Sequence, residues 1–182
     1  MSNNLGFYSF ILLIIYIIYK EIYKGTSTIF KSGQYEYSRN HSNNSNFSAN
    51  STDLGIAIIS KNNNSTNINI QATIENENDP VSYSKNIVLE NGSCVVKTST
   101  KSFRIGTYTQ SDNIIKMILK GTVWRNNKET NKYQTIVVIY KFEENNIEGK
   151  HYIVPDETKI SEDLNDSWKL ISTDTFKKIT NC

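Results

Sequence analysis

The two histidines of this 182-residue chain limit the chemistry that its side chains can perform. A serine or cysteine nucleophile needs a general base, which is most often histidine. His41 lies in a polar, low-complexity segment, and His151 lies beside Tyr152 in a strand-like stretch, with no catalytic motif around either residue. We therefore interpret both as surface or structural residues and predict that the protein is not an enzyme.

The other reactive residue types are equally sparse. Adjacent carboxylates at 143–144 and 162–163 are conceivable as a glycosidase pair but are typical of solvated turns and helix ends. No His/Cys cluster has zinc spacing, and no glycine-rich phosphate loop is present. Cys94 and Cys182 either pair, if the domain faces an oxidising compartment, or are two free thiols. We expect no catalytic residues, no cofactor and no metal site.

Charge gives little indication of a partner. The chain has 20 basic and 18 acidic residues and a formal net charge of +2. No basic stripe with interleaved aromatic residues is present, so nucleic acid is not an expected partner.

Residues 1–24 predict a single membrane anchor. Residues 5–19 form an uncharged apolar run, which reaches the roughly 20 residues that span a bilayer if Lys20, Glu21 and Lys24 extend their charged ends to the interface. The alternatives are a cleaved signal peptide and a buried core helix. A signal peptide should begin with basic residues, whereas residues 1–4 contain none, so we favour a retained transmembrane helix.

The sequence leaves open which side of the membrane the rest of the chain occupies. Lys20 and Lys24 follow the apolar run, which by the positive-inside rule keeps the domain in the cytoplasm. Asn-X-Ser/Thr triplets argue for the opposite side, because glycosylation acceptors belong to secreted surfaces, although a chain this rich in Asn, Ser and Thr also forms them by chance. The candidate acceptors are Asn40, Asn43, Asn46, Asn50, Asn63, Asn64, Asn91 and Asn165.

The start of the chain also resembles the processing site of type IV pilins. Gly6 and Phe7 follow Asn-Leu and precede the apolar run, with a β-rich region further along. The resemblance implies cleavage after Gly6 and packing of the apolar helix into a filament. The sequence departs from the family in two places: the leader lacks Lys and Arg, and Ile11 stands where the family has a glutamate.

Residues 25–53 predict a flexible stalk. The segment 38–52 is rich in Asn and Ser and nearly free of residues that form a core, so burial cannot offset the entropy lost on ordering it. We expect this stalk to separate the anchor from a globular domain over residues 54–182.

After residue 54, apolar and polar residues alternate with a period of two. In residues 67–75, Ile68, Ile70, Ala72 and Ile74 share one face, which predicts a half-buried antiparallel strand. The dipeptide Asn91-Gly92 separates two apolar runs, 85–90 and 93–97, and predicts a tight hairpin with a type I′ turn. Further strands are expected over 103–109, 113–124, 133–142, 151–154 and 167–172.

These elements predict a mostly β fold, either an antiparallel β-sandwich or an open barrel. Residues 125–132 would join two long strands as a hairpin. Residues 136–140 are apolar on both faces and predict a strand that is buried on both sides. Residues 156–164 would form a short polar helix, and residues 173–179 a short C-terminal helix or tail.

Together these features favour a non-enzymatic, single-pass membrane protein whose β-domain mediates attachment or assembly at a cellular or viral membrane, as in a virion glycoprotein. Its partners would be the membrane, through the N-terminal helix, and another protein or further copies of itself. The alternatives are a small-ligand-binding β-barrel and a pilin-like filament subunit. Aromatic residues would line the cavity of such a barrel or pack in its core: Phe103, Tyr108, Trp124, Tyr133, Tyr140, Phe142 and Trp168.

Overall fold

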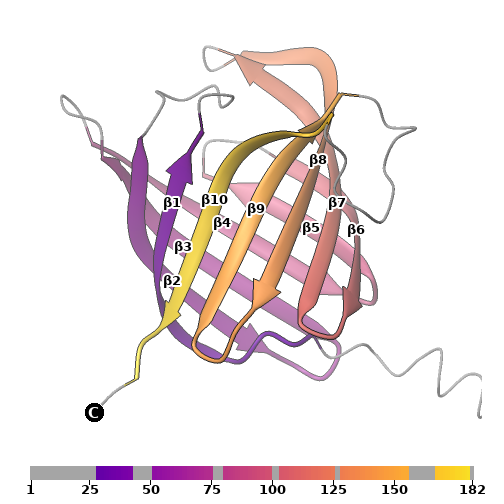
Figure 1. The fold of residues 1–182 in the computed structure, drawn as a ribbon. Helices are drawn as coiled ribbons and strands as arrows, with labels where there is room; N and C mark the ends of the chain where they lie inside the picture. Colours follow the sequence, from indigo (N-terminus) through magenta and orange to yellow (C-terminus); the bar gives the residue numbers. More distant parts are fainter. Residues whose placement is uncertain are drawn as a thin grey trace, which may run out of the picture.

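The computed structural model shows a closed barrel of ten antiparallel strands (Figure 1). It describes residues 28–42, 51–75, 80–99, 103–125, 128–155 and 167–180. Each strand pairs with the next one along the chain, and β10 pairs with β1 to complete the ring. The strands are β1 (Gly33–His41), β2 (Thr52–Lys61), β3 (Ser65–Glu75), β4 (Val81–Glu90), β5 (Ser93–Thr98), β6 (Phe103–Ser111), β7 (Ile114–Arg125), β8 (Lys128–Phe142), β9 (Asn146–Val154) and β10 (Lys169–Lys178).

Closure of the ring corrects the expectation of a sandwich or an open barrel. A closed ring leaves no strand edge unpaired, so each backbone ladder is completed by a neighbour. The closing contact is the pairing of β1 with β10, which runs from Tyr35 opposite Lys178 to His41 opposite Ser172. Neither of these two strands was expected over its full length.

The first of them, β1, lies inside the segment that the sequence analysis assigned to a flexible stalk over residues 25–53. Its inward-facing side chains are Tyr35, Tyr37, Arg39 and His41, and polar side chains alternate with them on the outside. The strand therefore lacks the apolar alternation by which a half-buried strand is recognised. The globular domain accordingly begins by residue 28 rather than at residue 54.

The second, β10, replaces the predicted C-terminal helix over residues 173–179. Ser172, Asp174 and Phe176 are buried inside the barrel, and Thr173, Thr175 and Lys177 alternate with them as less buried or exposed residues. Because the inward-facing Asp174 is a carboxylate, the alternation of apolar and polar residues that marks a strand is hard to recognise here. Pairing with β9 on one side and β1 on the other then determines the conformation.

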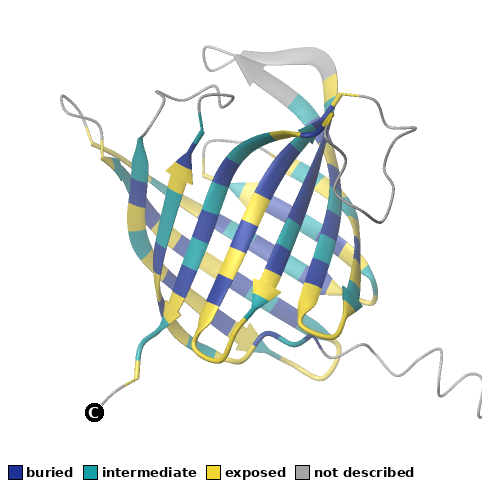
Figure 2. Cartoon of the chain, viewed as in Figure 1, coloured by how far each residue is buried: buried dark blue, intermediate teal, exposed yellow. Residues whose placement is uncertain are grey.

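The barrel interior contains the main hydrophobic core. Buried and exposed residues alternate along the strands (Figure 2). In β3, Ile68, Ile70 and Ala72 are at most 5% exposed and face inward, which confirms the predicted half-buried strand. A smaller cluster of Val137, Tyr152, Val154 and Trp168 packs on the outside of the barrel and explains why β8 is buried on both faces.

The turns at the lower end of the barrel, where β1 begins and β10 ends, are short. The turn between β4 and β5 has positive φ at both central residues, 48° at Asn91 and 79° at Gly92, which confirms the hairpin predicted from this dipeptide. The predicted hairpin between β7 and β8 is also present, at the upper end. Arg125 lies opposite Lys128, so residues 125 and 128–132, which were predicted to form the turn, belong to the strands. The other connections at the upper end are longer, and residues 43–50, 76–79, 100–102 and 156–166 in them lie outside the described part.

A short segment closes the lower end. Phe30 is 1% exposed and packs edge-on against Tyr140 and Phe142 from inside the ring, with centroid separations of 5.7 and 4.7 Å. The segment is held in place by a 3.0 Å bond from the backbone N–H of Ile29 to Gln110 Oε1. A second bond, of 2.5 Å, runs from Lys61 Nζ to the carbonyl oxygen of Thr28.

Several predicted elements lie outside the described residues. These are the anchor over residues 1–24, with the pilin-like site at Gly6, and the polar helix over 156–164. Among the residues that the structure does describe, no helix has the length and apolar character to cross a bilayer.

The alternation in β3 can be tested by a matched pair of charges. Ile68 is fully buried, so Ile68→Asp places an unpaired carboxylate in the core and should cost several kcal/mol, enough to unfold or aggregate the protein. The neighbouring Asn69→Asp faces water and should change the free energy of unfolding by roughly 0.5 kcal/mol or less. Urea unfolding of both variants measures the difference, and equal tolerance would contradict the assigned register.

The hairpin at Asn91-Gly92 makes a separate prediction. An added Cβ at Gly92 meets no atom within 4 Å, so any cost of substitution comes from its positive φ. Gly92→Val should therefore destabilise the fold by about 1 kcal/mol or more, whereas Gly92→Asn, which tolerates this conformation better, should cost clearly less. Thermal unfolding would show whether stability decreases from the wild type to Gly92→Asn to Gly92→Val. Equal melting temperatures would rule out strain at this residue.

Candidate functional site

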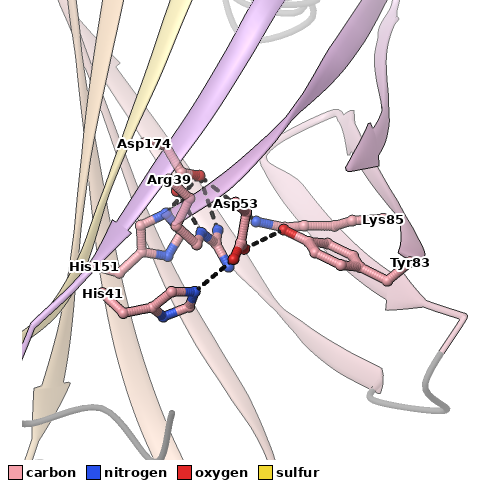
Figure 3. Close-up of polar contacts among 7 residues, drawn as sticks. All are labelled: Arg39, His41, Asp53, Tyr83, Lys85, His151 and Asp174. Carbon is pink, nitrogen blue, oxygen red and sulfur yellow. Dashed lines mark hydrogen bonds and ion pairs between the residues drawn. The ribbon is translucent and has the colours of Figure 1, made fainter. Parts of the chain in front are cut away.

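Polar side chains from five strands meet inside the barrel, toward its upper end (Figure 3). We call this group the polar cluster. Its interior position is unusual, because charged groups are rarely buried unless they are paired. The members of the cluster are Arg39, His41, Asp53, Tyr83, Lys85, His151 and Asp174.

Strand register places Arg39 between two carboxylates. Asp174 on β10 and Asp53 on β2 are the residues directly opposite Arg39 on its two neighbouring strands. Arg39 binds Asp174 through two bonds, Nε to Oδ1 at 2.6 Å and Nη2 to Oδ2 at 2.9 Å. This bidentate geometry is the strongest form of an arginine–carboxylate pair, and here it crosses the strand pairing that closes the barrel.

Asp174 also contacts two further cationic or titratable groups. Nε2 of His151 donates to Oδ2 of Asp174 at 2.9 Å, and Nζ of Lys85 lies 3.8 Å from the same oxygen. Asp174 is fully buried, and both partners are 7% exposed. One carboxylate therefore serves three basic side chains from β1, β4 and β9.

Asp53 is the second acceptor of the cluster. Its Oδ1 accepts a bond from Nε2 of His41 at 3.0 Å, and its Oδ2 accepts one from the hydroxyl of Tyr83 at 2.7 Å. Tyr83 is half-buried, and Asp53 and His41 are buried. Both oxygens of Asp53 are thus occupied by described partners.

Burial disfavours the charged forms of Arg39 and Asp174, but the attraction between the two groups outweighs it. Burial alone would raise the pKa of Asp174, but Arg39, His151 and Lys85 outweigh it and hold that pKa well below its usual range. Burial likewise works to lower the pKa of Arg39, and Asp174 more than compensates. Both groups are therefore charged at neutral pH.

The pKa values of the other two basic groups, His151 and Lys85, are lowered, which favours their neutral forms. Burial lowers the pKa of His151 to about 4 despite the attraction of Asp174, so the imidazole is neutral at pH 7. Burial and the nearby Arg39 lower the pKa of Lys85 to about 8. A lysine that is desolvated and next to another cation loses its proton more readily than one in water.

Two tyrosine hydroxyls complete the interior surface around the cluster. Tyr37 and Tyr140 are at most 2% exposed, and their hydroxyls make no hydrogen bond of ordinary geometry to the described residues. Tyr140 still interacts with Asp174, and Tyr37 with Tyr83. The ring of Tyr140 lies over Gly149, where an added Cβ would approach Cε1 of the ring to 2.3 Å. Burial, and then the charge of Asp174, raise the pKa of Tyr140 well above its usual value, so its hydroxyl keeps its proton.

A separate hollow of about 400 Å³ opens at the lower end of the barrel. Ile29, Tyr35, Phe142 and Ile147 contribute apolar surface to it, and Lys31, Asp112, Glu143, Glu144 and Lys178 contribute charges of both signs. It lies beside the closing segment and away from the polar cluster. The hydroxyl of Tyr35, at its edge, is already bonded to the carbonyl oxygen of Lys31 at 2.8 Å.

The structure places the sequence-predicted site residues apart from the cluster. Asn40, Asn64 and Asn91 are exposed, and Asn43, Asn46, Asn50 and Asn165 lie outside the described residues. Cys94 is a free thiol inside the barrel, where burial raises its pKa to about 12. Its proposed partner Cys182 is not among the described residues, so the disulfide stays a prediction. No group of three or more metal-ligating side chains forms within the described ranges.

The aromatic residues that were expected to line a cavity or pack the core divide between several places. Tyr108 and Tyr140 are buried inside the barrel, and Phe142 packs against its lower end. Trp168 belongs to the outer cluster, and Phe103 and Tyr133 are exposed on the outside. The side chain of Trp124 lies outside the described part.

Comparison with known proteins gives no family for this chain. Neither a protein family model nor a curated protein matches the sequence. One solved structure, EF1p2_mFAP2b bound to DFHBI, is similar over 81% of this chain and 93% of its own, with 10% sequence identity and a TM-score of 0.37. A likeness this distant says nothing of what this chain binds, which must be inferred from its own residues.

Burial of a neutral His151 predicts that the protein loses stability in mild acid. The unfolded chain protonates this residue near pH 6.5, whereas the barrel does so only near pH 4, because Asp174 does not outweigh burial and the repulsion of Arg39 and Lys85. Between these values the unfolded state binds more protons, so the free energy of unfolding should fall as the pH drops, by up to about 3 kcal/mol. His151→Gln keeps an N–H for Asp174 and should reduce the fall; an unchanged pH profile of urea unfolding would contradict the assignment.

Proposed function

We propose that the barrel binds a small molecule inside its upper half, next to the polar cluster. The observation that supports this proposal best is the pair of buried hydroxyls of Tyr37 and Tyr140, which lie beside an array of buried charges and make no hydrogen bond of ordinary geometry to the described residues. Native interiors satisfy nearly all buried polar groups, and unsatisfied ones call for a partner such as a ligand or ordered water.

Stability alone does not account for the polar cluster. A buried ion pair contributes little to stability compared with well-packed apolar residues of similar volume, because desolvation offsets the attraction. The lower half of this barrel is filled in that apolar way, by residues such as Ile59, Ile68 and Leu89. A change from apolar to charged interior along one barrel is therefore better explained by binding than by folding.

The two ends of the barrel support the same conclusion. Phe30 and its segment close the lower end, whereas the upper end has the longer connections. Loops carried by a rigid scaffold tolerate variation and commonly surround binding sites, and the openings of β-barrels are frequent positions for small-ligand sites. A ligand that enters from the upper end would meet Tyr83 and Asp53 before Lys85.

Attachment or assembly at a membrane is a second proposal. It rests on the uncharged apolar run over residues 5–19, followed by Lys20 and Lys24. It concerns a different part of the chain from the interior site, so a non-enzymatic membrane-anchored protein with a ligand-binding barrel satisfies both proposals.

Binding can be tested with two matched sets of small probes. Benzoate, benzamide and benzylamine have similar size and differ in charge, and butanoate, butanamide and butylamine repeat the series with an aliphatic group. Added to the ¹⁵N-labelled full-length chain, at least one probe should shift the amide signals of Arg39, Lys85 and Asp174. Signals from the lower turns at Asn64 and Asn91 serve as the control. If none of the six probes shifts the cluster signals, or if the shifts are confined to the lower end, the proposal is wrong.

A further inference from the structure

The upper interior has more hydrogen-bond donors than acceptors. Arg39, Lys85 and His151 all direct N–H groups to Asp174, whereas Asp53 accepts an N–H from His41 and the hydroxyl of Tyr83. Both oxygens of both carboxylates have described partners, so the cluster offers little capacity for further donors. Tyr37 and Tyr140 add two buried hydroxyl donors that make no hydrogen bond of ordinary geometry within the described part.

Lys85 is the least well bonded of the charged members. An ammonium carries three donors, and its one described contact in the cluster is the ion pair to Asp174, at 3.8 Å, longer than a hydrogen bond. Arg39, in contrast, holds the same carboxylate through two bonds of 2.6 and 2.9 Å. The side chain of Lys85 is 93% buried, so water outside the barrel does not solvate it.

The three donors without ordinary hydrogen bonds, on Tyr37, Tyr140 and Lys85, come from positions around Asp174. Asp174 lies opposite Gly149, which in turn lies opposite Tyr140, so these three residues cross β10, β9 and β8 in one row. Tyr37 is on the other side of Asp174, two residues before Arg39 on the same strand. After burial, the charge of Asp174 is among the causes that shift the pKa of Tyr37, Tyr140 and Lys85, which places all three close to it.

Formal charge inside the cluster is balanced before any ligand enters. Arg39 and Lys85 carry positive charge at neutral pH, Asp53 and Asp174 are the two carboxylates, and His151 is neutral. Arg104, on the opposite wall, adds a further guanidinium that contacts the backbone oxygen of Gln134 at 3.2 Å. Arg104 is bonded to Gln134 and has no described contact with the cluster, so the site is rich in donors while its own formal charge is balanced.

From this geometry we propose that the ligand is a small carboxylate, bound by the hydroxyls of Tyr37 and Tyr140 and by the ammonium of Lys85. This assignment rests on the proposed binding function and adds the chemical class of the ligand. A carboxylate has only acceptors, about four lone-pair sites, so it can bond to these donors without adding a donor of its own. An amine would add donors to a site that lacks acceptors, and a neutral amide would bring one acceptor group and two donors.

The first test compares affinities within each probe set. Benzoate should bind at least tenfold more tightly than benzamide and more tightly still than benzylamine, or butanoate should do so within its own set, when cluster shifts are titrated at pH 7. If the amide or amine probe of a set binds at the cluster as tightly as the carboxylate, the ligand class is wrong while the binding function stands. If no probe binds there, both are wrong.

The second test separates a ligand-binding role of the hydroxyls from a structural one. Tyr140→Phe and Tyr37→Phe remove donors that make no hydrogen bond of ordinary geometry, so the free protein should be as stable as before or slightly more stable, while the affinity for the carboxylate falls about tenfold. Tyr35→Phe is the control, because it removes a hydroxyl at the lower hollow and should leave this affinity unchanged. Loss of stability without loss of affinity in the first two variants would contradict the proposal.

The third test uses the proton of Lys85. The titratable groups that face it are Arg39, Asp53, Cys94, His151 and Asp174, from five strands. Its pKa of about 8 should rise when a carboxylate binds, so binding takes up a proton and the affinity should fall as the pH increases from 8 to 10. In Lys85→Met the affinity at pH 7 should be at least tenfold weaker and nearly independent of pH. A wild-type affinity that is constant from pH 7 to 10 would overturn the role of Lys85.

Discussion

The pairing of Arg39 with Asp174 is the constraint on which the upper half of the barrel depends. The two residues are directly opposite each other on the strands that close the ring, and their bidentate contact is almost completely shielded from water. Removal of either partner would leave an uncompensated charge in the interior, which costs several kcal/mol. The same carboxylate also orients His151 and Lys85, so the closure of the fold and the arrangement of the site share one group.

The sequence predicted the strands whose inward faces are apolar. Ile68, Ile70 and Ala72 alternate with polar residues, and Asn91-Gly92 has the turn chemistry of a tight hairpin, so both were recognised from local pattern alone. Strand β1 was missed, and β10 was predicted only as far as residue 172, because their inward residues include Arg39, His41 and Asp174. A pattern of apolar inside and polar outside cannot identify a strand whose buried face is charged. Without those two strands, closure of the barrel could not be predicted.

The candidate site could not be found from the sequence for a related reason. His41 and His151 are 110 positions apart and have no motif around them, so each was interpreted alone, as a structural residue. Their carboxylate partners, Asp53 and Asp174, are 121 positions apart. Only the cyclic order of the strands, with β10 next to β1 and β1 next to β2, brings these four residues into one network. The alternation of Arg39 with outward-facing polar residues is the one local pattern that could have indicated a buried charge, and it is weak by itself.

The even number of strands has a directional consequence. In a ring of ten antiparallel strands that follow one another along the chain, the polypeptide enters β1 and leaves β10 at the same end, next to the segment that carries Phe30 (Figure 1). Anything joined covalently before residue 28 or after residue 180 is therefore connected to the closed base. The polar cluster lies toward the opposite end of the barrel. A tether or a fused protein at either terminus would therefore be attached at the end that is farther from the cluster.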